Sequence, residues 1–246
     1  MKSWIEFWNA EHSIYVNNVH KLAHAKKIYN DMCSQIEGEN YSILDFGCGE
    51  ALYAEGISKK CAELVVMDTS CKVRKLLMER TRGVENITIT NNSDLLKFED
   101  EKFDLIVVNS VFQYLNKLET IRALELFHRI LKHNGKLIIA DIIPPNLSIL
   151  SDVFSLLRLS IENAFFLSAI VGLFKTYISD YKNLRKQIGL SVYSSDQFIK
   201  LLSNSNFVAE LESQNFGHNQ KRCCFRATKS NNCLLYTSPS PRDNSG

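Results

Sequence analysis

A glycine-rich segment follows the first strongly apolar stretch of the chain. Residues 43–49 read ILDFGCG, and the residues after them have helical character. Glycine suits a backbone that bends sharply or lets a ligand approach without a Cβ in the way. The unpaired N–H groups at the start of a following helix favour an anionic group such as a carboxylate or a pyrophosphate. The segment therefore predicts a binding loop for a ligand with an anionic end.

Two aspartates narrow the choice of ligand. Asp45, just before the first glycine, would repel a pyrophosphate but would form a charge-assisted hydrogen bond with an α-amino group. Leu52 also stands where a dinucleotide-binding fingerprint has its third glycine. Asp68 follows the glycines by about 20 residues, the spacing at which an acid reaches ribose hydroxyls. NAD and S-adenosylmethionine both carry such a ribose, so Asp68 predicts an adenosine site without choosing between them.

Alternating apolar and helical segments must position these residues. From Tyr41 onward, short apolar runs alternate with stretches of helical period, which is typical of βαβ units and a parallel sheet. Strands are expected at 42–46, 63–67, 87–90, 103–109 and 136–142, and helices at 51–60, 71–82 and 118–131. His133-Asn134-Gly135 predicts a turn before the fifth strand, with a left-handed Gly or Asn. Asn109 to Tyr114 then lie at the carboxyl edge of the sheet, the usual ligand side.

Further helices and a hairpin surround this core. A helix is expected at 14–36, a helical insertion at 147–177, a helix at 197–202 capped near Ser194, and a closing hairpin at 208–214 and 223–228. The apolar residues 164–174 are too few to span a bilayer, which takes about 20. We expect them to form a lid, a dimer surface or a wall for a lipid-like acceptor.

The expected domain organisation is simple. Residues 1–40 form an N-terminal helical extension and residues 41–232 a single domain, in which 146–193 is the insertion or lid. Residues 233–246 carry two of the four prolines and resemble the translation of a sequencing-library adaptor, with a disordered tail as the alternative. We expect no chemistry from them.

Together, these motifs resemble those of class I S-adenosylmethionine-dependent methyltransferases. The match covers roughly residues 40–145 and rests on residues 45–49, Asp68, the strand 103–109 and residues 131–137. It implies an α/β, Rossmann-like fold with a seven-stranded, mostly parallel sheet and an antiparallel last strand, plus the N-terminal helix and the insertion after the fifth strand. Residues 11–17 and 216–220 are also similar to a bacterial-type subgroup, methyltransferase type 11/12-like, of unassigned substrate.

The resemblance also implies S-adenosyl-L-methionine as the cofactor and places it residue by residue. Asp45, Gly47, Cys48 and Gly49 would surround the methionine moiety, and Asp68 and Thr69 would contact the ribose. Asn92 and Ser93 would lie near the adenine, and Asn109 would line the floor of the cofactor site. One departure concerns the adenine. The acidic residue often found near it is absent at the expected offset, because Asn92 stands there and Asp94 lies two residues further on.

Composition limits the partners. The formal net charge is +2, from 29 basic and 27 acidic residues, so no long-range field favours nucleic acid or an anionic membrane. Seven cysteines without a C-x-x-C pair predict neither a metal site nor a disulfide framework. The N-terminus has no apolar segment of signal-peptide type. We therefore expect a cytoplasmic monomer or homodimer without a transmembrane segment, and peripheral membrane contact stays open.

The catalytic residues are the least determined. Tyr114, His218 and His12 are weak candidates for orienting or deprotonating an acceptor. The other histidines are expected at the surface, and Cys48 is expected to fill a turn rather than act as a nucleophile. The favoured function is methyl transfer to a small or hydrophobic acceptor. A nicotinamide-dependent oxidoreductase and a non-catalytic cofactor-binding module are the alternatives.

Overall fold

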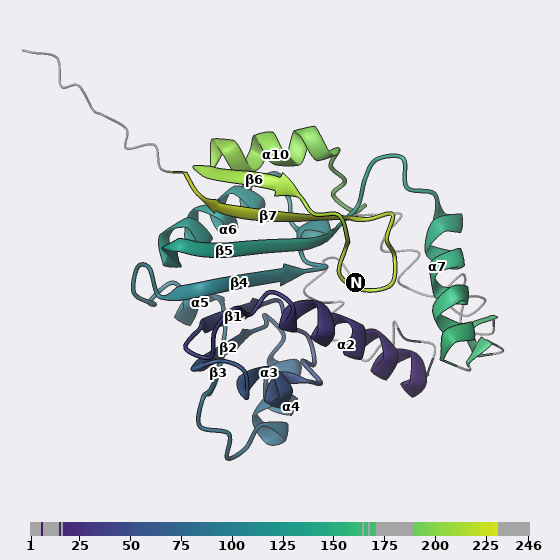
Figure 1. The fold of residues 1–246 in the computed structure, drawn as a ribbon, viewed down its shortest axis with the longest axis horizontal. Coiled ribbons are helices and arrows are strands. Elements are labelled where there is room, and N and C mark those ends of the chain that lie inside the picture. Colours follow the sequence, from purple (N-terminus) through teal and green to yellow (C-terminus); the bar gives the residue numbers. More distant parts are fainter. Residues whose placement is uncertain are drawn as a thin grey trace, which may run out of the picture.

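Seven strands form one sheet through the middle of the molecule (Figure 1). The structure is a computed structural model that describes Glu6, Tyr15 and residues 17–163, 165–166, 168–170 and 189–230. The strand order is β3-β2-β1-β4-β5-β7-β6. In chain order the strands are β1 (Ser42–Phe46), β2 (Glu63–Met67), β3 (Ile87–Thr90), β4 (Phe103–Asn109), β5 (Leu131–Ile142), β6 (Phe207–Leu211) and β7 (Cys223–Lys229).

The strand directions match the expected fold class. β1 runs parallel to β2 and β4, β2 is parallel to β3, and β4 is parallel to β5. β7 is antiparallel to both β5 and β6, so one strand is reversed at this side of the sheet. The predicted seven-stranded, mostly parallel sheet with an antiparallel last strand is confirmed.

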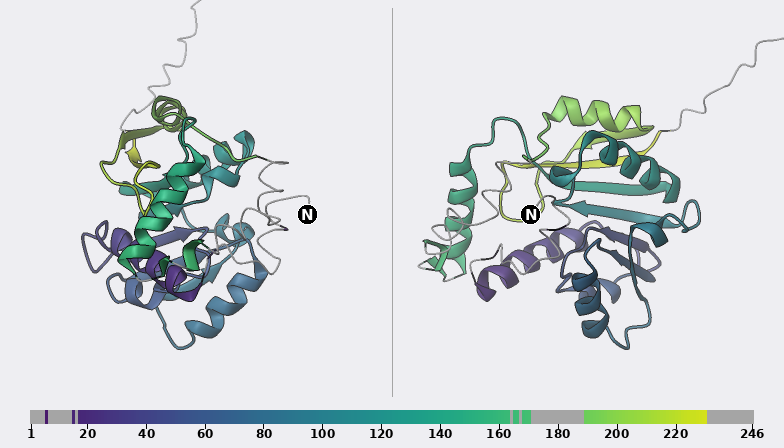
Figure 2. Two further views of the ribbon diagram at one scale, coloured as in Figure 1. Left: turned by 90° about the vertical axis from the view of Figure 1, so that its right-hand side faces the viewer. Right: turned by 180° about the vertical axis from the view of Figure 1, so that it is seen from behind.

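Helices cover both faces of the sheet (Figure 2). They are α2 (Asn18–Cys33), α3 (Ala54–Ser58), α4 (Cys71–Arg80), α5 (Asn92–Leu95), the 3₁₀ turn η1 (Phe112–Tyr114), α6 (Lys117–Ile130), α7 (Ile149–Glu162) and α10 (Ser195–Asn204). Side chains of successive strand residues point to opposite faces. Leu44 accordingly packs with α6 and α10, whereas Ile43 packs with α2, α3 and α4. Because both faces are covered, β1, β2 and β4 are apolar almost throughout.

Several helix and strand ends differ by a few residues from the prediction, and two of these differences bear on the site. β5 begins at Leu131, which pairs with Phe103, and the expected turn at 133–135 is instead a bulge inside this strand. Gly135 does not take the left-handed conformation, and neither does Asn134. A Cβ on Gly135 would lie 3.0 Å from the carbonyl oxygen of Phe103, so this glycine serves close strand approach.

The second difference concerns the helix after the glycines. α3 begins at Ala54 rather than at residue 51, and Ala51 has a left-handed φ of 37°. The expected helix start directly after the glycines is therefore wrong. The loop itself, and not a helix N-terminus, lies beside the end of β1.

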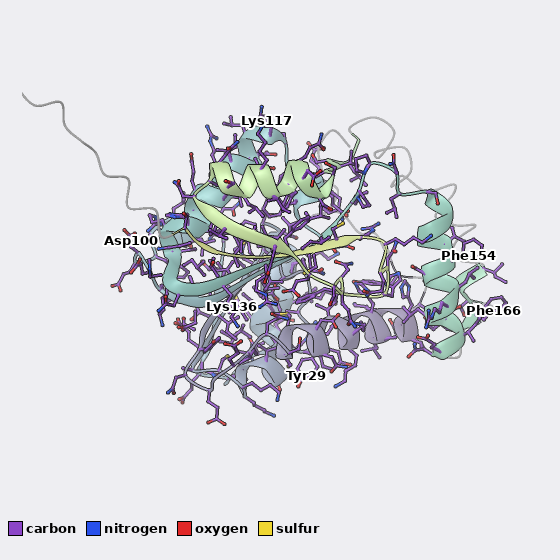
Figure 3. All side chains as sticks on the ribbon, turned by 45° about the horizontal axis from the view of Figure 1, so that its top comes forward. Tyr29, Asp100, Lys117, Lys136, Phe154 and Phe166 are labelled. Carbon is purple, nitrogen blue, oxygen red and sulfur yellow. The ribbon has the colours of Figure 1, made fainter. Side chains whose placement is uncertain are left out.

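The insertion after β5 is only partly described. α7 stands at one end of the molecule, next to α2 and away from the sheet (Figure 2), and Leu159, Phe165 and Ala169 form a small buried cluster there. Phe154 is 68% exposed, and Figure 3 shows it with Phe166 at the outer side of the molecule. Residues 171–188 of the insertion and the tail 233–246 lie outside the described residues. No described helix is long and apolar enough to cross a membrane.

Candidate functional site

The glycine loop is held against the neighbouring strand. The backbone N–H groups of Gly47 and Cys48 both donate to the carbonyl oxygen of Met67, at 2.8 and 3.0 Å. Gly47 has a φ of 72°, and a Cβ on it would lie 2.4 Å from Cγ2 of Val111. Gly49 has a φ of 55° and open space where its Cβ would be. Packing against Val111 therefore excludes any side chain at Gly47. No protein atom occupies the space beside Gly49, so a ligand could approach the backbone there.

Asp45 lies at the carboxyl end of β1 and is buried. Burial and, second, the negative charge of Asp68 raise the pKa of Asp45 to about 7. A carboxyl group in this state favours a positive partner, because a nearby cation would stabilise its charged form. The position and the pKa together suit a group that binds an ammonium.

Asp68 follows β2 and organises the two loops around it. Its carboxylate accepts the backbone N–H of Gly49 at 3.0 Å and that of Ser70 at 2.7 Å. Arg74 donates to the backbone carbonyls of Asp68 and Thr69. Burial raises the pKa of Asp68, while the two backbone N–H groups and Arg74 oppose this rise. Asp68 thus joins the loops that follow β1 and β2, with the exposed Thr69 beside it.

The predicted adenine contacts lie on the short helix α5. Asn92 and Ser93 are exposed, and the side chain of Asn91 caps the helix by accepting the N–H groups of Ser93 and Asp94. The Ser93 hydroxyl also donates to this side chain, at 2.6 Å. Asp94 forms an ion pair with Lys97, which lowers its pKa. Among the described residues, no hydrogen bond links Asn92 or Ser93 to Asp45 or Asp68.

Asn109 ends β4, the strand that pairs with β1 on the side opposite β2. Its side-chain oxygen Oδ1 is buried and has no hydrogen-bond partner among the described residues. Buried polar atoms in proteins are nearly always bonded, so an orphaned acceptor of this kind calls for an explanation. A ligand donor at this position would supply one.

A polar network at the ends of β4 and β5 was missed by the sequence analysis. Ser110 and Asp141 both adopt left-handed backbone conformations, with φ values of 59° and 66°. The Ser110 hydroxyl donates to the Asp141 carboxylate at 2.6 Å, and Arg222 donates to the same oxygen at 2.7 Å. Strained non-glycine residues cluster at functional sites. Ser110 falls within residues 109–114, which were expected at the carboxyl edge of the sheet, whereas no pattern in the sequence marks Asp141 near the end of β5.

Three histidines come together beside this network, which corrects the expectation that most of them lie at the surface. His20 and His24 come from α2, and His218 comes from the loop between β6 and β7. His20 is only 6% exposed, and Nδ1 of His24 lies 3.3 Å from Nδ1 of His218. The four-residue spacing of His20 and His24, which puts them on one helix face, was the available signal.

The remaining candidates are placed as follows. Tyr114 ends η1 and is half-buried. Gln113, beside it, is buried, and its side-chain oxygen accepts a hydrogen bond from the guanidinium of Arg222 at 3.4 Å. Burial, and then Asp45, raise the pKa of the Cys48 thiol, which agrees with a turn residue rather than a nucleophile. His12 lies outside the described residues. Among the described residues, no group of three or more His, Cys, Asp or Glu side chains could hold a metal ion.

Comparisons with known proteins identify relatives of the domain that carries this site. Residues 44–139 match the family model of a methyltransferase domain. A demethylmenaquinone methyltransferase of Thermotoga maritima is 26% identical over 172 residues, which are 69% of this chain and 71% of that protein.

Solved structures share the fold. A phosphoethanolamine N-methyltransferase of Haemonchus contortus, in complex with phosphoethanolamine and S-adenosylhomocysteine, has a TM-score of 0.62 and 16% identity, over 92% of this chain and 48% of that one. The magnesium protoporphyrin IX methyltransferase of Synechocystis, with bound S-adenosylhomocysteine, has a TM-score of 0.55 and 13% identity, over 92% and 93%.

Proposed function

We propose that the chain is a class I S-adenosylmethionine-dependent methyltransferase and that it transfers the methyl group of this cofactor to a small-molecule acceptor. The methyltransferase domain model matched by residues 44–139, the related demethylmenaquinone methyltransferase and the shared fold support this. One observation carries the assignment of the site. The carboxyl ends of β1, β2 and β4 bring two acids, an open glycine loop and an orphaned amide oxygen to one edge of the sheet. These are the groups that a ligand with an ammonium, a carboxylate and a ribose needs.

Each part of this edge has a proposed partner on the cofactor. Asp45 takes the ammonium, and the loop at Gly49 leaves room for the methionine chain, with Cys48 as a filler. Asp68 uses one lone pair of each oxygen for the backbone, and an ionised carboxylate has about four such sites, so it can also accept ribose hydroxyls. Asn109 accepts one further donor of the cofactor through its orphaned oxygen.

The adenine is proposed to lie between Thr69 and the start of α5. Thr69 is exposed in the loop that follows β2, and Asn92 and Ser93 are exposed at the start of α5, which follows β3. Asp94, the acid of this helix, is exposed and paired with Lys97, so backbone groups are expected to contribute most of the recognition.

Methyl transfer depends mainly on aligning the acceptor atom with the methyl group of the cofactor. When bound, S-adenosylmethionine supplies an electrophilic methyl group on a positively charged sulfur. The protein residues fix this end of the ligand at the sheet edge, orient the acceptor in line with it and exclude water. Ser110, Asp141 and Arg222 lie one strand further along and suit the acceptor side.

The acceptor is proposed to be a small molecule. The relatives and structural neighbours are named for demethylmenaquinone, magnesium protoporphyrin IX and phosphoethanolamine. In this chain the rings of Tyr15, His20 and Phe165 form a row, with centroids 5.4 Å apart in each of two successive pairs. His20 and Phe165 are buried, so we propose the half-buried Tyr15 as the ring of this row that meets a flat or apolar part of the acceptor.

The wider context is proposed on the same basis. We take residues 41–232 as the methyltransferase domain, with the insertion at 146–193 acting as a lid over the acceptor. The six described cysteines are free thiols, which supports a cytoplasmic location. The oligomeric state is open between a monomer and a homodimer.

Two experiments test the function. Calorimetry and thermal shift compare S-adenosylhomocysteine with NAD and NADP, since only a true ligand stabilises the fold appreciably. Labelled S-adenosylmethionine is then incubated with the purified protein and fractionated extract. We expect S-adenosylhomocysteine, but neither NAD nor NADP, to bind and stabilise the protein. We expect the labelled methyl group to appear in the small-molecule fraction. Stabilisation by NAD would favour the oxidoreductase, and binding without transfer to any fraction would favour a non-catalytic module.

A further inference from the structure

We propose that Arg80 is a positioning residue for the methyl donor. It holds the peptide between Glu50 and Ala51, and thereby the glycine loop, in the shape that binds the cofactor, and the carboxylate of Glu50 in turn aligns the guanidinium of Arg80. The inference rests on the proposed function and deepens it, because it assigns the shape of the cofactor loop to an arginine at the end of α4.

Ala51 has a backbone conformation that costs free energy. Its φ is 37°, in the left-handed region, where the Cβ of an L-residue lies too close to the following carbonyl oxygen. Glycine would adopt this conformation without that cost. Residues held in such regions persist only where the surrounding structure fixes them, and they cluster at ligand clamps and active sites. The bonds on either side of Ala51 therefore show what holds the loop.

The peptide before Ala51 is held at both of its polar groups. Its N–H, on Ala51, donates to the carbonyl oxygen of Cys48 at 3.2 Å and closes a turn of residues 48–51. Its carbonyl, on Glu50, accepts a hydrogen bond from Nη1 of Arg80. The φ of Ala51 is the rotation about the bond that joins this peptide to the Cα of Ala51. Fixing the peptide therefore fixes one side of that rotation.

The peptide after Ala51 is held by the start of α3. The carbonyl oxygen of Ala51 accepts the N–H of Ala54, the first residue of α3, at 2.9 Å. Of the three bonds to the two peptides, two lie within residues 48–54, and the third comes from Arg80, 30 positions after Glu50. Arg80 therefore supplies the tertiary contact that keeps this strained turn in place.

The side chain of Glu50 aligns Arg80 for this contact. Its Oε2 lies 3.7 Å from Nη2 of Arg80, while Nη1 of the same guanidinium bonds the Glu50 carbonyl. Arginine suits both contacts at once, because its planar fork presents N–H groups in fixed directions. The side chains of Arg80 and Glu50 are 31% and 35% exposed, and such partly buried pairs are screened by salt less than fully exposed ones.

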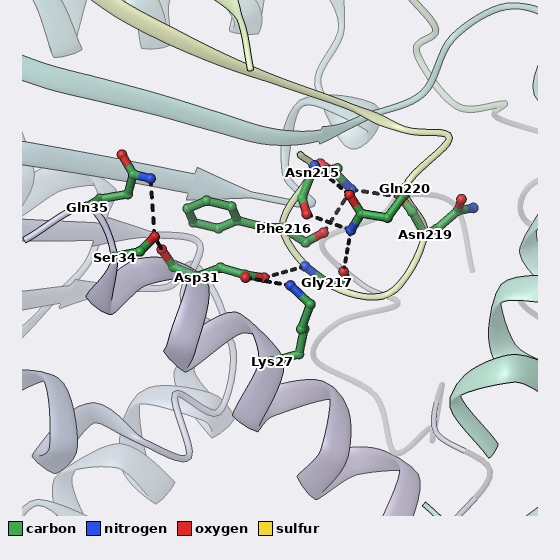
Figure 4. A network of polar contacts seen from close by, with 9 residues as sticks. All are labelled: Lys27, Asp31, Ser34, Gln35, Asn215, Phe216, Gly217, Asn219 and Gln220. Atoms are coloured by element: carbon green, nitrogen blue, oxygen red, sulfur yellow. Dashed lines mark hydrogen bonds and ion pairs between the residues drawn. The ribbon is translucent and has the colours of Figure 1, made fainter. Parts of the chain in front are cut away.

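Lys21 of α2 also holds the Glu50 carboxylate. Its Nζ lies 2.6 Å from the same Oε2. α2 is itself anchored further along, where Asp31 accepts the N–H of Gly217 at 2.9 Å and pairs with Lys27 (Figure 4). The carboxylate is therefore held by α2 and α4 together, and both helices pack on the same face of the sheet.

The start of the same loop is fixed independently. Gly49 donates its N–H to Asp68 at 3.0 Å, and the two loop residues on either side of position 47.5 bond the end of β2 in the same way as described above. Gly49 thus lies between the bonds to the end of β2 and the bond from Arg80. A shift of the peptide after Glu50 therefore changes the turn that carries Gly49.

The expected size of the effect follows from the strain at Ala51. Without the Arg80 bond, we expect Ala51 to relax towards the right-handed region, which a residue with a Cβ prefers. The apparent dissociation constant rises by the inverse of the fraction of molecules whose loop keeps the binding shape. The usual cost of a left-handed alanine reduces that fraction to about one tenth. The competing explanation is a direct attraction between Arg80 and the anionic end of the cofactor, which depends on charge alone.

The first test replaces Arg80. Arg80→Lys keeps the charge but loses the fork, and Arg80→Gln loses both. In calorimetry with S-adenosylhomocysteine, we expect both to bind about tenfold more weakly than the wild type. The matched control is Arg82→Gln, at an exposed position on the same segment, which should bind within about twofold of the wild type. Urea unfolding checks that each variant folds.

The second test asks whether the loss passes through Ala51. Ala51→Gly allows the left-handed conformation without the cost of a Cβ, so the loop depends less on Arg80. The loss caused by Arg80→Gln should therefore shrink from about tenfold in the wild-type background to about threefold or less in the Ala51→Gly background. Glu50→Gln should show a smaller loss that shrinks in the same way, because it leaves the backbone acceptor for Arg80 in place. If Arg80→Gln does not fold, the comparison with Glu50→Gln decides.

The outcomes separate this inference from the proposed function. If the wild type binds no S-adenosylhomocysteine, the proposed function fails and this inference fails with it. If the wild type binds it and Arg80→Lys binds equally tightly, or if the loss in Arg80→Gln or Glu50→Gln is the same in both backgrounds, only the positioning role of Arg80 is overturned. A loss of the expected size in both Arg80 variants, reduced by Ala51→Gly, supports that role.

Discussion

The carboxylate of Asp68 accepts the backbone N–H of Gly49 at 3.0 Å, and this bond joins the loops that follow β2 and β1. The same carboxylate accepts the N–H of Ser70, so one side chain organises both sides of the proposed ribose site. Together with the bonds from Gly47 and Cys48 to the carbonyl oxygen of Met67, this carboxylate holds the glycine loop against the end of β2.

Replacing this acid tests the site. Asp68→Ala removes two acceptors of ribose hydroxyls and leaves two backbone N–H groups without their partner. We expect the affinity for S-adenosylhomocysteine to fall by about 100-fold or more, because each hydrogen bond to a charged group contributes about 1.5–3 kcal/mol. Calorimetry checks the affinity, and circular dichroism checks that the variant folds. Replacement of the exposed Glu99 by alanine is the control, and unchanged affinity in Asp68→Ala would contradict the assignment.

The raised pKa of Asp45 predicts a pH-dependent affinity. The carboxyl group has a pKa of about 7 in the folded protein, and it must be ionised to pair with an ammonium. The dissociation constant for S-adenosylhomocysteine should therefore be constant above pH 7 and rise about tenfold per pH unit below it. Titrations between pH 5.5 and 8 measure this. Asp45→Asn should bind more weakly and without this dependence, and a flat wild-type profile would refute the role of Asp45.

The same group affects stability with a defined sign. Its pKa in the folded protein lies above the value of about 3.9 in an unfolded chain, so the folded state binds the proton more tightly. The stability that Asp45 contributes is complete below pH 4 and is lost as the pH rises to about 7. In the absence of ligand, the free energy of unfolding should therefore fall less between pH 4 and pH 7 in Asp45→Asn than in the wild type. Urea unfolding at several pH values checks this.

His20 should act on stability in the opposite direction. Burial and the charge of His218 depress its pKa to about 4, below the value of about 6.5 in an unfolded chain. The free energy of unfolding should therefore fall as the pH drops from 6.5 towards 4, by at most about 1.4 kcal/mol per pH unit from this group. In His20→Phe, which keeps a ring against Phe165, this part of the slope should disappear. An identical slope in wild type and variant would mean that His20 is not buried as described.

The two loop glycines should differ in what they tolerate. Gly47→Ala combines a left-handed φ with a clash against Val111, so we expect a loss of about 2–4 kcal/mol in the free energy of unfolding. Gly49→Ala meets no protein atom and should lose only about 1–2 kcal/mol, but its methyl group should weaken cofactor binding. Adding Val111→Ala should recover part of the stability of Gly47→Ala. Equal stability of the two single variants would argue against this packing.

The sequence predicted the elements whose boundaries are set locally. β1, β2, β3 and β4 match because each is a short apolar run bounded by turn residues. The start of β5 at Leu131 was missed because it depends on pairing with Phe103, a contact across the sheet. The start of α3 was missed because Ala51 adopts a left-handed conformation that no propensity favours.

The same distinction applies to the site. Asp45 and Asp68 could be placed because the carboxyl ends of parallel strands share one edge. The sequence did not predict the histidine cluster, because His24 meets His218, which lies 194 residues further along the chain. Ser110 and Asp141 are likewise brought together by tertiary contacts, namely the hydrogen bond between them and the one from Arg222.

The bond between Asp31 and Gly217 joins residues 186 positions apart. A ribosome therefore completes β1 to β4, with every proposed cofactor contact, long before the partner of Asp31 leaves the exit tunnel. Contacts between such distant parts of a chain form late and slowly in folding. A nascent chain thus gains the proposed cofactor contacts first and the loop that contacts α2 last.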